Sequence, residues 1–190
     1  MRVLQIAALA LLVTVASAMP ARAQSFPDEF TWGVQGGLGM GYGTVPPDSG
    51  TTREMGSPFA GGIFAAIPIG GGFRFQPEFK FDHREVTIGG ITTKANYLSV
   101  PLLFRNDFLG IFMTQGVSLN FLRSATVLDN DFKDAYTSLD YGIIMGLGKT
   151  VGRVSLEGRW DTGLRSFQKD IGVGGVRHRA LTGVVSVHLK

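Results

Sequence analysis

The sequence predicts an all-β fold, an eight-stranded, antiparallel, up-and-down transmembrane β-barrel. Three observations lead to this fold class. The N-terminus has the pattern of an export signal, the rest of the chain contains eight extended segments with apolar and polar residues in alternation, and short and long connections alternate between them. Together these features are typical of barrels in the bacterial outer membrane.

The first residues predict the compartment. Arg2 gives a positive start, residues 3–15 are almost wholly apolar, and Ala21-Arg22-Ala23 forms a small-x-small cleavage site, with Ala16-Ser17-Ala18 as a second candidate. The apolar run is shorter than the about 20 residues that a membrane-spanning helix needs. Residues 1–23 are therefore expected to be a signal peptide and residues 24–190 the outer-membrane β-barrel domain.

The composition excludes several classes of function. Removing the first 23 of the 190 residues takes away Arg2 and Arg22, so the basic residues fall from 18 to 16 against 15 acidic ones. No concentrated basic surface remains for nucleic acid. The absence of cysteine excludes disulfides and thiolate metal sites. The 27 glycines suit the tight curvature and crowded interior of a small barrel.

Alternation predicts the strands, and residues 73–82, which read FRFQPEFKFD, show it most clearly. Odd positions are apolar and even positions are polar or charged, so the two sets fall on opposite faces of a strand. That pattern suits lipid on one side and a small polar interior on the other. The eight predicted strands are 30–41, 58–69, 72–86, 91–106, 110–122, 136–149, 152–164 and 179–190.

The connections between the predicted strands are alternately long and short along the chain. Those after the second, fourth and sixth strands are short, whereas residues 42–57, 123–135 and 165–178 form long polar connections after the first, fifth and seventh. The link at 87–90 is the short exception. Short turns at one end and long loops at the other match outer-membrane barrels, in which the turns are periplasmic and the loops face outward.

Three stretches resemble the PorT-like outer-membrane β-barrel family. They are Gln76-Pro77-Glu78 in an aromatic strand, the run YLSVPLLFR at 97–105, and Asp140-Tyr141-Gly142 leading to the GLG at 146–148. The resemblance covers essentially the whole mature chain. It implies an eight-stranded outer-membrane barrel without an enzymatic activity common to the family. Ser99 stands where family members commonly carry an acidic residue.

The polar faces of the predicted strands form the main candidate site. Because eight strands leave an interior that side chains can fill, we expect a salt-bridged, filled lumen rather than an ion or solute path. The predicted lumen charge network consists of Arg74, Glu78, Lys80, Asp82, Arg105, Asp140, Glu157, Arg159 and Asp161. The predicted interfacial aromatic residues are Trp32, Tyr97, Tyr141 and Trp160.

The histidines give only weak support for catalysis. A lipid-modifying barrel enzyme needs a nucleophile, a base and an orienting acid within hydrogen-bond reach. None of His83, His178 and His188 has an obvious serine and acid partner on the same face at the same height. No catalytic residue, cofactor or metal is therefore expected. The acidic residues at 129–131 and Asp134 are expected to form a solvated loop rather than a calcium site.

The function predicted from these patterns is a structural or loop-mediated interaction or binding protein in the outer membrane. Its expected partners are the lipid bilayer, the insertion machinery and an extracellular or periplasmic protein. A narrow outer-membrane pore is the main alternative, and a lipid-modifying barrel enzyme is the third. A soluble lipocalin-like barrel, which would bury the phenylalanine face inside, is the structural rival.

Overall fold

A computed structural model describes residues 29–44, 53–54, 56–88, 91–108, 110–128, 130–131, 133, 137–165 and 177–190. The predicted signal peptide lies outside the described residues. The described part consists of eight long strands and two strands of two residues. They are β1 (Thr31–Thr44), β2 (Arg53–Glu54), β3 (Phe59–Gly70), β4 (Phe73–Ile88), β5 (Ile91–Phe108), β6 (Ile111–Val127), β7 (Asn130–Asp131), β8 (Leu139–Val151), β9 (Val154–Gly163) and β10 (Arg177–His188).

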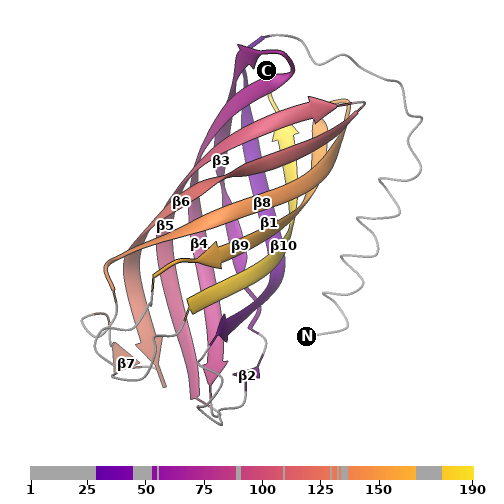
Figure 1. Cartoon of the computed structure of the whole chain (residues 1–190). Helices are drawn as coiled ribbons and strands as arrows, with labels where there is room; N and C mark the ends of the chain where they lie inside the picture. Colours follow the sequence, from indigo (N-terminus) through magenta and orange to yellow (C-terminus); the bar gives the residue numbers. More distant parts are fainter. Residues whose placement is uncertain are drawn as a thin grey trace.

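The eight long strands close into one antiparallel barrel (Figure 1). Each pairs with the next long strand along the chain, and β1 pairs with β10 from Gly33 opposite His188 to Thr44 opposite Arg177. The two short strands extend the wall, since β2 pairs with β4 and β7 with β6. The predicted all-β, eight-stranded, up-and-down barrel is confirmed.

The glycines of the short turns have positive backbone φ angles. Gly70, Gly71 and Gly72 have φ of 97°, 63° and 79° between β3 and β4, and Gly110 and Gly152 have φ of 78° and 61° in the two other short turns. Glycine adopts this conformation without the steric cost of a Cβ. These glycines therefore let the chain reverse in very few residues at one end of the barrel, as the sequence predicted.

The two faces of the wall differ as the alternation predicted. On β4, Phe79 is 51% exposed on the outside, whereas its neighbour Glu78 is 3% exposed on the inside. Segment 58–69, which hardly alternates in sequence, also has two faces, because Phe64 and Ala66 are buried while Ile63 is exposed. Large apolar side chains cover the outside of every long strand. Such a continuous apolar surface requires lipid rather than water around it.

Several strands continue beyond the predicted ends. The ends of β4, β5 and β6 project past their neighbours at the end that carries the long connections (Figure 1). There the outward residues become polar, as at His83 opposite Asn96, but the backbone ladder continues. At this end the prediction is five residues short for β6, which continues to Val127, and two short for β4, whereas β5 begins at the predicted Ile91. No helix among the described residues is long and apolar enough to span a membrane.

Candidate functional site

The nine predicted lumen residues lie on β4, β5, β8 and β9, with their side chains toward the interior. Seven are buried, while Lys80 and Asp161 are half-buried. All of them except Lys80, together with two residues that the prediction missed, form three groups at different heights. The middle cluster contains Glu78, Glu157 and Arg159; the loop-side cluster contains Asp82, Arg84, Asp140 and Asp161; and the turn-side cluster contains Arg74, Arg105 and Asp107.

The middle cluster is centred on the Arg159 guanidinium. Its Nη1 and Nη2 donate to the two carboxylate oxygens of Glu78, both at 2.7 Å. Its Nε and Nη2 donate to Glu157 at 2.8 and 2.9 Å. Two parallel bonds to one carboxylate fix both the distance and the orientation of the pair. Arg159 therefore joins two carboxylates in one rigid unit.

Neutral groups complete this unit. Gln35 and Gln76 donate to the Glu78 carboxylate at 2.6 and 2.8 Å, and the Thr114 hydroxyl donates to Glu157. A buried ion pair needs such additional hydrogen bonds because the charges have lost their water. The wall leaves space for it at Gly146, where a Cβ would overlap Glu157 Oε1 and Thr114 Oγ1.

Arg84 holds the loop-side cluster together. Its Nε and Nη2 donate to Asp82 Oδ2 at 3.0 and 2.9 Å, its Nη1 donates to Asp140 at 3.1 Å, and Asp161 lies 4.0 Å from Nη2. Arg84 was not predicted from the sequence, although it lies two residues after Asp82 on the same strand and therefore faces the interior as well. Ser99, where the resembled family carries an acid, points its hydroxyl at Asp82 Oδ2 over 3.5 Å.

The turn-side cluster occupies the other end of the interior. Asp107, also missed from the sequence, pairs with Arg105 at 2.7 Å and with Arg74 at 3.3 Å. The Arg105 guanidinium lies over the Phe112 ring, 3.6 Å from its centroid. It also donates to Thr150 at 2.9 Å. A charged group and a stacked aromatic ring thus fill the interior next to the short turns.

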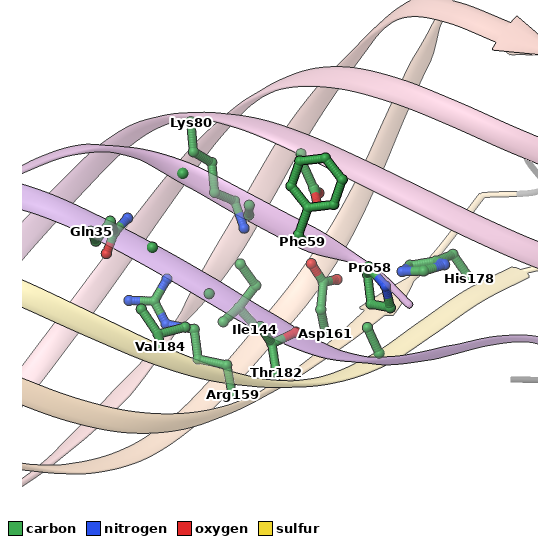
Figure 2. Close-up of a pocket in the computed structure, with 16 residues that line it drawn as sticks. Gln35, Pro58, Phe59, Lys80, Ile144, Arg159, Asp161, His178, Thr182 and Val184 are labelled. Atoms are coloured by element: carbon green, nitrogen blue, oxygen red, sulfur yellow. The ribbon is translucent and has the colours of Figure 1, made fainter. Parts of the chain in front are cut away.

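Lys80 is on the inner face but outside the three clusters. Among the described residues it makes no ion pair within 4.0 Å. It lines a cavity of about 30 Å³ that also contacts Gln35, Asp161, Arg159 and His178 (Figure 2). One water needs about 10–15 Å³ by the same measure, so this space holds about two waters. An aqueous channel needs far more.

One histidine has the serine partner that the sequence did not reveal. Ser155 Oγ lies 2.9 Å from His188 Nε2 and 2.6 Å from Thr150 Oγ1. This contact supplies the serine alone, so it does not contradict the prediction that no histidine has both a serine and an acid partner at its own height. The two partners come from adjacent strands, β9 and β10, and are 33 residues apart in sequence. The Ser155 hydroxyl is on the inner face and is buried.

Three of the four predicted interfacial aromatic residues are on the outer face. Trp32, Tyr141 and Trp160 are exposed there, whereas Tyr97 is only 2% exposed and lies inside, with Arg84 4.7 Å from its ring centroid. The assignment of Tyr97 to an interfacial girdle is wrong. Tyr97 is two residues from Ser99 on β5, so both side chains point to the same face of the strand, and the Tyr97 ring lies in the interior.

Two further histidines and the acidic segment were also candidates from the sequence. His178 is buried on the inner face, while His83 faces outward and its Nδ1 lies 2.7 Å from Asn96 Oδ1. The described residues include no group of three or more histidines, cysteines or carboxylates that could hold a metal ion. Asp129 and Asp134, from the weighed calcium site, lie outside the described residues.

Comparison with known families identifies the architecture. A family model described as "Outer membrane protein beta-barrel domain" matches residues 22–169. The chain belongs to this outer-membrane β-barrel family. The predicted location in the bacterial outer membrane is confirmed, and the apolar outer face of the barrel contacts the lipid bilayer. A comparison with curated protein sequences gives no match.

Solved outer-membrane barrels are similar to this chain in fold. Neisserial surface protein A has 17% identity and a TM-score of 0.54, and the match covers 82% of this chain and 96% of that one. Ail of Yersinia pestis, solved with the heparin analogue sucrose octasulfate, has 11% identity, coverage of 85% and 99%, and a TM-score of 0.49. The outer membrane enzyme PagL has 11% identity, coverage of 80% and 98%, and a TM-score of 0.40. At these identities the likeness concerns the fold alone.

Proposed function

We propose that this outer-membrane barrel is a non-catalytic scaffold with a closed lumen, and that its loops bind an external ligand or a partner protein. The observation that carries the proposal is the Arg159–Glu78 pair. Arg159 is on β9 and Glu78 on β4, and three long strands separate β9 from β4 in either direction around the barrel. A rigid pair across the full width leaves little space for solute.

The other two clusters support the same proposal. Arg84 on β4 bonds to Asp140 on β8 near the loop end, and Arg105 stacks on Phe112 near the turn end. Fixed side chains therefore cross the lumen at the middle and loop-side heights, and a third group occupies it beside the turns. The cavity between the middle and loop-side clusters holds only about two waters. A protein with this interior acts through its loops and its outer surface rather than by conduction.

Liposome swelling tests the closed lumen. Proteoliposomes that contain the folded barrel are diluted into isotonic solutions of urea, glycerol or arabinose, and light scattering reports solute entry. We expect the swelling rate of protein-free liposomes. Swelling that falls with increasing solute size would establish the narrow pore instead.

The enzymatic alternative has one specific feature to test, the Ser155–His188 pair. We propose a structural role for it, because the Ser155 hydroxyl is buried in the interior and shared with Thr150. Incubation of the barrel with labelled lipopolysaccharide and phospholipid is expected to give no cleaved product. Product that disappears in Ser155→Ala would contradict the non-catalytic role.

We also propose the finer assignments made from the sequence. Membership of the PorT-like group is supported by the resemblance at residues 76–78, 97–105 and 140–148, which lie in β4, β5 and β8. Export followed by insertion through the outer-membrane machinery is supported by the pattern of residues 1–23. N-terminal sequencing of the membrane-extracted protein is expected to begin at Gln24, and retention of residue 1 would contradict processing.

A further inference from the structure

The outer surface changes character sharply on β4, β5 and β6. On β6 the outward residues from Ile111 to Phe121 are apolar except Gln115, and the exposed Arg123 follows. Ten residues at about 3.3 Å each, tilted by about 40°, span about 25 Å along the bilayer normal. That span equals the apolar band of an outer-membrane barrel. Arg123 therefore stands directly above the lipid-facing surface, at the level of headgroups.

Arg123 has the outward alternation of Phe121 and lies at a β-bulge. Asn96 pairs with Ser124 and Tyr97 with Leu122, so Arg123 is an extra residue without a partner on β5. Bulges change the direction of a side chain on a regular strand. Here Arg123 and Ser124 are both accessible next to each other, while Leu122 is buried. The local geometry therefore presents the guanidinium on the outside.

Polar neighbours on the adjacent strands extend the surface. His83 Nδ1 lies 2.7 Å from Asn96 Oδ1, and Asn96 Nδ2 donates to Ser124 Oγ at 2.8 Å. The Phe59 ring stacks on His83 with centroids 4.7 Å apart and an angle of 23°. We call His83, Lys94, Asn96, Arg123 and Ser124 the rim patch. Its hydrogen-bonded chain of three residues makes a fixed polar platform across three strands.

The cations of the rim patch differ from the arginines inside. Lys94 and Arg123 are exposed, and neither forms an ion pair with another described residue, whereas Arg84 and Arg159 are each paired with carboxylates. Glu85 stands opposite Lys94 in the ladder, so two cations and one anion occupy the surface. Directly below them are the apolar side chains of the bilayer-spanning region. A molecule with phosphate groups and acyl chains matches both the basic rim patch and the apolar surface below it.

We propose that the rim patch binds the phosphorylated headgroup of an outer-leaflet lipid, with Arg123 and Lys94 as phosphate ligands. Arginine presents parallel donors that suit phosphate oxygens, and lysine adds a point charge. Acyl chains of the same lipid pack on Phe81, Leu98 and Phe121, which lie two residues from His83, Asn96 and Arg123 on the side facing the bilayer centre. The inference rests on the orientation with loops outward, but not on whether the lumen conducts.

The experiment compares two double variants with the same loss of charge. Lys94→Gln with Arg123→Gln removes the cations of the rim patch. Lys149→Gln with Arg153→Gln removes two exposed cations at the turn end and is the matched control. The detergent-solubilised, folded barrels are incubated with diphosphorylated lipid A, with the same lipid after dephosphorylation, or with excess inorganic phosphate, and bound lipid is measured by native mass spectrometry.

We expect the wild type and the turn-end variant to retain diphosphorylated lipid A. The rim-patch variant should bind it at least about tenfold more weakly, since each basic residue near a lipid surface contributes to affinity. Arg123→Lys alone should keep most of the binding, which shows that charge at this position matters and that the barrel still folds. Dephosphorylated lipid should bind weakly to every variant. Equal retention by the two double variants, or displacement of the lipid by inorganic phosphate, would overturn the proposal. Solute permeability through the same preparations tests the closed lumen separately.

Discussion

Arg159 and Glu78 form a bidentate ion pair across the full width of the barrel, with both bonds at 2.7 Å. The two residues are 81 positions apart in the chain and lie on opposite walls. The pair binds β9 to β4 through the interior as well as around the wall. It also places two buried charges where water is scarce, so we expect the loss of either partner to change stability and, if the proposed closed lumen is right, permeability.

Replacing Arg159 by Met is expected to lower the free energy of unfolding by about 3–5 kcal/mol, because Glu78 and Glu157 lose their shared cation. Urea titration of the barrel in lipid vesicles measures the change. Lys80→Met is the matched control, since it removes a lumen cation that makes no ion pair with a described residue. Equal losses in the two variants would mean that the ion pair has no special role.

The outer face gives a second prediction. Phe79→Arg places a charge against lipid and is expected to cost about 2–4 kcal/mol near the bilayer midplane. Lys80→Ala, one residue away on the inner face, should leave insertion intact. Heat-modifiable migration in gels reports the folded fraction of each. If both variants lost the folded barrel equally, the assignment of the faces would be wrong.

Close packing at Gly146 gives a third prediction. Gly146→Ala should destabilise the barrel by about 1–3 kcal/mol, because the added Cβ overlaps Glu157 and Thr114. At the exposed Gly158, a Cβ would have its nearest atom, Leu147 O, at 3.9 Å, so Gly158→Ala should be tolerated. The same urea titration compares them, and similar midpoints would contradict a tightly filled lumen.

Topology gives a fourth prediction. Trypsin added to intact cells should cleave near Arg53, Lys133 or Lys169, which belong to the three connections that the sequence predicts to be long, because proteolysis concentrates at exposed loops. Lys149 and Arg153, at a short turn, should stay intact. Mass spectrometry of the fragments identifies the sites. Cleavage confined to the turn at Lys149 and Arg153 would reverse the orientation.

Sequence alternation predicted the strand number and the two faces of each strand, because a strand in a lipid bilayer has only two environments. The nine residues assigned to the lumen lie on the inner face, although Lys80 makes no ion pair with another described residue. The alternation did not predict partners across the barrel. The residues of β9 that lie level with a given residue of β4 depend on the stagger of all eight strands around the barrel. No pattern within a single strand determines this stagger. The Ser155–His188 contact joins the adjacent strands β9 and β10, which are separated in the chain by a long connection.

Arg84 and Tyr97 show a different limit. Both side chains follow the alternation of inward and outward residues on their strands, so the sequence could have predicted that they face the interior. Arg84 was left out of the predicted network although the predicted strand, residues 72–86, already contained it and β4 continues to Ile88. Tyr97 was assigned by residue type, since tyrosines often occupy interfaces, and parity overruled that preference. The bulge at Arg123 had no signal in the sequence, because bulges depend on pairing.

Single-channel recording of the wild-type protein in planar lipid bilayers tests the central claim most directly, because the claim is that side chains close the lumen. With the folded barrel inserted, the account predicts no steady conductance at moderate voltage, and small intermittent currents only after Glu78→Ala or Arg159→Ala. Stable, ohmic conductance from the wild type would contradict the account, because it requires a continuous water path past the Arg159–Glu78 pair.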